Sequence, residues 1–166
     1  MTAEKDRLWH ASTLHAVRRS VEILVVFLFS ILTIAVFVQV VARYVFNSPP
    51  AWTEELARFC QVWIILLASS ICIRKGSHLA VDYIGPSLKP RVRKALGVLI
   101  GALIVGYSVV VTVWGIRLMA VGLLQVSPAM QVNMAVVYAV FPVGGALMVV
   151  EATVATLRRL QDGAGQ

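Results

Sequence analysis

The stretch ILVVFLFSILTIAVFVQVVA, residues 23–42, decides the fold, because it is twenty residues long and carries no charged side chain. An α-helix of about 20 apolar residues crosses a hydrocarbon core roughly 30 Å thick. A secretory signal has a shorter apolar region, of about 7–15 residues, followed by a small-residue cleavage site. This run instead ends in Gln39-Val-Val-Ala-Arg43. We therefore predict a retained transmembrane helix over about 20–42.

The composition of the whole chain also indicates lipid as the solvent. Its 166 residues are 59% hydrophobic and 14% charged, with a mean hydropathy of +0.83. Soluble domains contain roughly 45–50% apolar and about 25% charged residues. The formal charge of +7 does not indicate nucleic acid as a partner, because no basic stretch is interleaved with aromatic side chains. Cys60 and Cys72 lie on one predicted helix, about 18 Å apart by helical rise, too far for a disulfide.

Three further spans are predicted, over about 50–74, 95–117 and 133–152. Ser48, followed by two prolines, provides an N-cap for the second span. Ser127-Pro128 is the expected break in the uncharged stretch 118–150, and Pro142 should kink the last helix. The fold class is therefore all-α, a single four-helix membrane domain over 1–166. The last span ends near Glu151, so we expect no charge at the middle of the membrane.

The distribution of cationic side chains predicts the orientation. With four spans, the N-terminal segment, the basic loop 74–94 and the C-terminal tail share one side, which carries twelve Lys and Arg residues. The other side carries only Arg43, Arg58 and Arg117. Cytoplasmic loops carry the excess of Lys and Arg. Both termini are therefore predicted to be cytoplasmic.

The second span begins with a polar stripe. At 100° per residue, Glu54, Glu55, Arg58 and Gln61 occupy one arc of the helix. Glu54 and Arg58 stand at i, i+4 in the favourable order for an ion pair. This stripe either contacts a partner protein, or the first helix near Arg43, or it is an interfacial helix start whose charges face headgroups and water.

Two tryptophans and two glycines are candidate packing sites. Trp52 is expected to be an aromatic-belt anchor at the outer interface, whereas the deeper Trp63 is expected in a protein contact. Gly97 and Gly101 form a small-xxx-small pair, which Ala102 and Gly106 repeat. Such pairs let two helices approach closely. The neighbouring helix could belong to this chain or to a partner.

The basic loop after the second span contains a histidine and an aspartate one helical turn apart. His78 and Asp82 supply two possible metal ligands, whereas structural zinc sites normally use four. We expect them to order the loop together with Arg74. Lys89, Arg91, Arg93 and Lys94 are expected to contact anionic lipid headgroups. There is no phosphate loop, nucleophile elbow or HExxH motif in the sequence, so we expect neither catalysis nor a cofactor.

The ordered set Arg43-Tyr-Val-Phe46, Trp52-Thr-Glu54-Glu55-Leu56-Ala-Arg58, Trp63 and Arg74-Lys-Gly-Ser-His78-Leu-Ala-Val-Asp82 resembles the small, DctQ-like membrane subunit of tripartite ATP-independent periplasmic (TRAP) transporters. The resemblance implies a bacterial inner-membrane protein that pairs with a large multi-pass permease subunit. In this family the large subunit carries the sodium and substrate sites, and a periplasmic substrate-binding protein delivers the substrate. The outer loops, Arg43 to Pro50 and Arg117 to Val132, are then candidates for touching that binding protein. The expected substrates are organic anions such as C4-dicarboxylates or sialic acid.

Two other functions remain open from the residues alone. A small four-helix multidrug exporter acting as a homodimer needs a carboxylate well inside its first helix, and the candidate here, Glu22, is at the cytoplasmic edge. A structural subunit of another membrane complex would show the same lack of catalytic motifs. We expect no transport by this chain alone.

Overall fold

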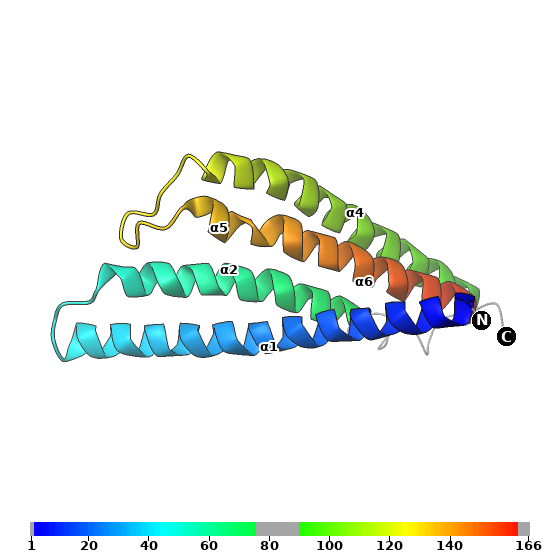
Figure 1. Ribbon diagram of the computed structural model, residues 1–166, viewed down its shortest axis with the longest axis horizontal. Coiled ribbons are helices and arrows are strands. Elements are labelled where there is room, and N and C mark those ends of the chain that lie inside the picture. Colours follow the sequence, from blue (N-terminus) through cyan, green and yellow to red (C-terminus); the bar gives the residue numbers. More distant parts are fainter. Residues whose placement is uncertain (1, 76–89, 163–166) are drawn as a thin grey trace. The chain divides into compact units, whose positions relative to one another are not determined.

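The computed structural model describes residues 2–75 and 90–162, and its described part is helical apart from connecting loops. The helices are α1 (Thr2–Tyr44), α2 (Ala51–Arg74), α4 (Pro90–Gly122), α5 (Met134–Tyr138) and α6 (Val140–Asp162) (Figure 1). Four stretches are long and apolar enough to cross a membrane: His15–Tyr44, Ala51–Arg74, Ala95–Gly122 and Met134–Leu157. The predicted all-α class with four membrane spans is confirmed.

The chain divides into two compact units, Met1–Ala68 and Ser69–Gln166, and each is described by itself. The single domain over 1–166 and the cytoplasmic position of both termini stay predictions.

Several helices extend beyond the predicted spans. α1 begins at Thr2 rather than near residue 20, α4 continues to Gly122, and α6 continues to Asp162. The reason is that hydropathy detects where a helix leaves lipid. A backbone that satisfies its own hydrogen bonds continues as helix into a polar environment until a cap or a breaker ends it.

In the first unit, a short connection reverses the chain between α1 and α2 (Figure 1). The Ser48 N–H donates to the Ala42 carbonyl at 3.2 Å, and Asn47 adopts a left-handed φ of 48°, which asparagine tolerates well. Because α2 begins at Ala51, Pro50 and not Ser48 precedes it, and the predicted Ser48 cap is wrong. The Pro50 carbonyl accepts bonds from the Thr53 N–H at 3.3 Å and the Thr53 hydroxyl at 2.7 Å.

In the second unit, α4 and α6 pack closely because glycines line their contact. A Cβ added at Gly115 would lie 2.6 Å from the Phe141 Cβ and 2.9 Å from the Pro142 nitrogen. A Cβ at Gly122 would lie 2.9 Å from the Ala135 nitrogen, on α5. Small residues allow helix backbones in membranes to approach closely. We call these contacts the glycine seam; it also includes Gly101, opposite Thr156, and Gly145, opposite Thr112.

The last span is interrupted between α5 and α6. The interruption falls at Ala139, three residues before Pro142. Proline lacks the N–H that would bond the carbonyl of the fourth residue before it, here Tyr138. The helical course nevertheless resumes, because the Val143 N–H donates to the Ala139 carbonyl at 3.2 Å. The kink predicted at Pro142 thus corresponds to an interruption of the helix three residues before the proline.

The loop from α4 to α5 is ordered by hydrogen bonds around Asn133. The Asn133 side chain accepts from the Ala135 N–H at 2.8 Å, and it donates to the Leu123 carbonyl at 3.1 Å. An isolated antiparallel bridge joins Val126 to Asn133, and the Ser127 N–H donates to the Val132 carbonyl at 2.9 Å. One asparagine thus caps α5 and closes the loop onto the end of α4.

We expect Asn133→Ala to lower the free energy of unfolding of the second unit by about 1–2 kcal/mol, since it removes both a helix cap and a loop-closing bond. Asn133→Asp retains the acceptor for the Ala135 N–H but loses the donor to Leu123, so its loss should be smaller. Thermal unfolding of the detergent-purified chain measures both. Equal stability of Asn133→Ala and the wild type would show that the loop does not depend on this side chain.

Candidate functional site at the polar start of α2

The first turns of α2 carry an ion pair on one side of the helix. The Arg58 Nη2 atom donates to the Glu54 Oε1 atom at 2.6 Å, as the i, i+4 spacing predicts. The two side chains are 66% and 61% exposed. An exposed pair of this kind contributes only about 0.2–1 kcal/mol to stability. The pair therefore contributes little to the stability of the fold, and its exposed groups are available to contact another molecule.

The other members of the predicted stripe differ in exposure. Gln61 follows Arg58 at i+3 and is exposed, whereas Glu55 is half-buried and has an interaction partner within the chain. Trp52 is 46% exposed and Trp63 is half-buried; their roles as a belt anchor and in a protein contact stay predictions. The exposed part of the stripe consists of Glu54, Arg58 and Gln61.

Arg43 is exposed in the last turn of α1. Among the described residues, the structure shows no ion pair between Arg43 and the stripe. A direct link between Arg43 and the polar start of α2 is thus not part of this structure.

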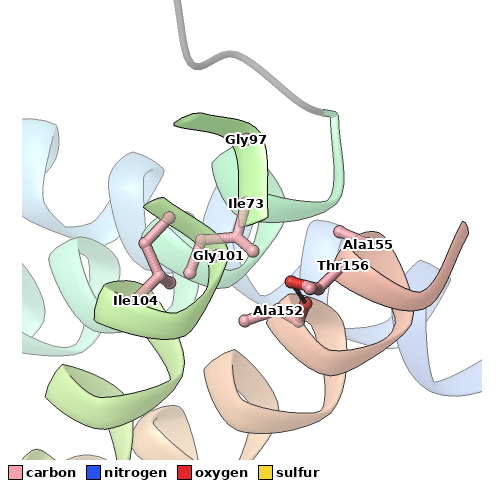
Figure 2. Close-up of a pocket in the computed structure, with 7 residues that line it drawn as sticks. All are labelled: Ile73, Gly97, Gly101, Ile104, Ala152, Ala155 and Thr156. Atoms are coloured by element: carbon pink, nitrogen blue, oxygen red, sulfur yellow. Dashed lines mark hydrogen bonds between the residues drawn. The ribbon is translucent and has the colours of Figure 1, made fainter. Parts of the chain in front are cut away.

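The predicted Gly97–Gly101 pair packs inside the chain. Gly97 is buried, and a Cβ at Gly101 would overlap the Thr156 hydroxyl on α6. The Thr156 hydroxyl donates to the Ala152 carbonyl at 2.8 Å (Figure 2). Both glycines line a small cavity together with Ile73, Ile104, Ala152, Ala155 and Thr156. Gly106, by contrast, faces open space, with no atom within 4 Å of an added Cβ.

Several predicted site residues belong to the basic loop. Arg74 is half-buried at the end of α2, and the residue has an interaction partner. His78, Asp82 and Lys89 lie outside the described residues. Arg91, Arg93 and Lys94 lie in the first turns of α4, where only the helical backbone is described. Their roles in loop ordering and headgroup contact stay predictions.

The C-terminal end of α4 carries a further cationic group. The Arg117 guanidinium lies over the Trp114 ring, 5.1 Å from its centroid, and both residues are exposed. Tryptophan and arginine are typical of the membrane–water interface. Beyond this pair, Leu124 is 90% exposed on the ordered loop. This end of the second unit therefore presents an exposed cation stacked on a tryptophan, next to an exposed apolar loop residue.

Glu151 is a buried acidic residue that was not among the predicted site residues. This residue was expected at the cytoplasmic end of the last span, but the span continues to Leu157, and Glu151 is only 7% exposed. Glu151 is thus a buried carboxylate inside the candidate span, six residues before its end, and the expectation of no charge at the middle of the membrane stays a prediction. The signal that was available is the apolar run after Glu151, Ala152-Thr-Val-Ala-Thr-Leu157, which keeps the helix within lipid for a further six residues.

Within the described residues, no group of three or more His, Cys, Asp or Glu side chains lies close enough to hold a metal ion. The chemistry that the stripe itself offers is recognition, through one carboxylate, one guanidinium and one amide on a single helix face.

Comparison with known proteins identifies relatives of this chain. The family model described as the DctQ component of tripartite ATP-independent periplasmic transporters matches residues 32–162. A TRAP transporter small permease protein of Haemophilus influenzae is 32% identical over 79 residues, 48% of this chain and 49% of the relative. The isethionate TRAP transporter permease protein DctMQ of Oleidesulfovibrio alaskensis is 34% identical over 117 residues, 69% of this chain and 17% of the relative.

The sialic acid TRAP transporter permease protein SiaT of Haemophilus influenzae is 36% identical over 56 residues, 34% of this chain and 9% of the relative. The aligned stretch thus spans about half of the small permease protein and a much smaller part of the two larger proteins.

Proposed function

The chain belongs to the DctQ component family of tripartite ATP-independent periplasmic transporters, and on this basis we propose that it is the small permease subunit of such a transporter. Its partners are a large multi-pass permease subunit and a periplasmic substrate-binding protein. The family match over residues 32–162 carries this proposal, because it includes all four candidate spans in whole or in part.

The exposure of the helices supports a scaffold role. Only 6% of the most apolar window of the first span is buried within the chain, and 11% of that of the third. Lipid or another protein must cover this surface. Two relatives, DctMQ and SiaT, are permease proteins in which the segment similar to this chain is a small fraction of the length. A large permease is therefore the partner that suits these helices.

In this proposal the transport chemistry belongs to the partner. Sodium ions and substrate bind to the large subunit, and this chain is neither an enzyme nor a carrier of cofactors. The names of two relatives refer to isethionate and sialic acid, which are both organic anions, so an organic acid is the proposed substrate class. The chain lies in the bacterial inner membrane with both termini in the cytoplasm, as the distribution of cations predicts.

Affinity capture of the tagged chain from detergent-solubilised membranes of its own host, followed by mass spectrometry, tests the proposed partnership. We expect recovery of one large multi-pass permease in near-equal amount. A clean homodimer with no permease would contradict the proposal and would favour the exporter alternative, with Glu22 as the next residue to test.

The exposed ion pair of α2 gives a second test. Because Glu54 and Arg58 contribute little to the stability of the isolated chain, Glu54→Ala or Arg58→Ala should change its free energy of unfolding by less than about 1 kcal/mol. If the stripe contacts the permease, each variant should recover much less permease in the capture experiment, since the remaining charge is stranded in the interface. Normal capture and normal uptake in both variants would assign the pair to headgroups and water instead.

A further inference from the structure

Glu151 lies inside the candidate membrane span Met134–Leu157 of the second unit, six residues before its end. The glycine seam sets the register, with Gly101 opposite Thr156 and Gly145 opposite Thr112. Glu151 is therefore level with the α4 segment between residues 101 and 112. That segment is midway between Lys94 and Arg117, which bound the uncharged stretch of α4. At a rise of 1.5 Å per residue, Glu151 is about 17 Å along the helices from either of them.

A carboxylate at this depth needs a specific partner. A glutamate side chain is too short to reach water from there, and ionisable residues within membrane spans face the protein interior and pair with one another. Glu151 is consistent with this rule, since it is buried and the residue takes part in an interaction within the chain. The neighbouring packing indicates which element supplies the partner.

The last turn of α2 packs against the same part of α6. Ile73 is buried in a cluster with Met148 and Ala152, the residues at i−3 and i+1 from Glu151. Figure 2 shows Ile73 beside Gly101 and opposite Ala152. Arg74 follows Ile73 directly, is half-buried and also has a partner. Among the cations of this unit whose side chains the structure describes, Arg74 is thus the one that the packing brings near the level of Glu151.

We propose that Arg74 and Glu151 form an ion pair within the membrane and that this pair fixes the last turn of α2 onto α6. The guanidinium is the cation suited to this role, because it stays protonated and can donate two parallel hydrogen bonds to one carboxylate. The pair gives Arg74 a function in helix packing rather than in ordering the basic loop. This inference does not depend on the proposed transporter partner.

The test is a comparison of single and double neutral variants of the full-length chain. Breaking a buried pair strands one charge, so Glu151→Gln and Arg74→Gln should each lower the apparent Tm by on the order of 10 °C. The double variant, Glu151→Gln with Arg74→Gln, leaves no stranded charge and should recover more than half of that loss. Tryptophan fluorescence during heating of the detergent-purified chain follows unfolding.

Two controls distinguish the ion pair from a general effect. Lys75→Gln removes the adjacent cation, which is exposed, and should leave the Tm unchanged. Ser70→Ala tests whether Ser70, which is buried one helical turn before Arg74 and is 5% exposed, is the group on which Glu151 depends. Additive losses in the double variant, or a loss with Ser70→Ala and none with Arg74→Gln, would overturn the proposal. If a single variant does not accumulate, the amounts of single and double variants in membranes give the same comparison.

Discussion

Replacing Gly115 by valine is expected to separate α4 from α6 and to lower the free energy of unfolding of the second unit by about 3 kcal/mol or more. An added Cβ at this position meets the Cβ and the backbone carbon of Phe141 and the nitrogen of Pro142, at 2.6–2.9 Å. Backbone atoms cannot move aside as the end of a flexible side chain can, so the cost is at the upper end of that for overpacking. Thermal unfolding of the purified chain measures the loss.

Gly106→Val is the matched control for this substitution. Gly106 lies on the same helix, but no atom is within 4 Å of an added Cβ. Its substitution should leave the Tm unchanged within about 2 °C, because surface changes usually cost under 0.5 kcal/mol. Equal losses at Gly106 and Gly115 would mean that the effect comes from valine in a membrane helix and not from the glycine seam.

Deleting the gene for this chain from its host is expected to abolish uptake of the transporter's substrate, although the sodium and substrate sites are proposed to lie on the large permease. A scaffold subunit acts by keeping its partner assembled, and the poorly buried apolar spans of this chain are suited to such a permanent contact. Uptake of radiolabelled organic acid by deletion cells, with and without the restored gene, measures the effect.

Restoring the deletion cells with the Arg58→Ala gene instead of the wild-type gene tests whether the polar start of α2 is needed for this uptake. Partial uptake together with reduced capture of the permease would place the defect in assembly. Undiminished uptake in the deletion cells, with the permease still present, would show that this chain is not required by the transporter.

The sequence predicted features that depend on neighbouring residues. The apolar runs identified four spans, Pro142 indicated the interruption before α6, and the spacing of Glu54 and Arg58 indicated their ion pair. Each of these depends on the composition of one segment or on groups one helical turn apart, so that no knowledge of tertiary packing is needed.

Features that depend on the register between helices could not be predicted in this way. The pattern of small residues in α4 pointed to Gly106 as well as Gly101, but Gly106 faces open space, and the closest approaches to backbone atoms of a neighbouring helix are at Gly115 and Gly122. The burial of Glu151 was not predicted, because it depends on packing between α6 and residues far away in the sequence, such as Ile73. The spacing of small residues indicates that a helix can pack closely. Which of these residues make the close contact depends on the position of the neighbouring helix.

Reconstitution of purified components in proteoliposomes tests the central claim most directly. Three preparations are compared under an inward sodium gradient with the substrate-binding protein present: this chain alone, the large permease alone, and both together. The account predicts organic-acid uptake only when both subunits are present, and none by this chain alone. Uptake or export by this chain without the permease would contradict the scaffold role.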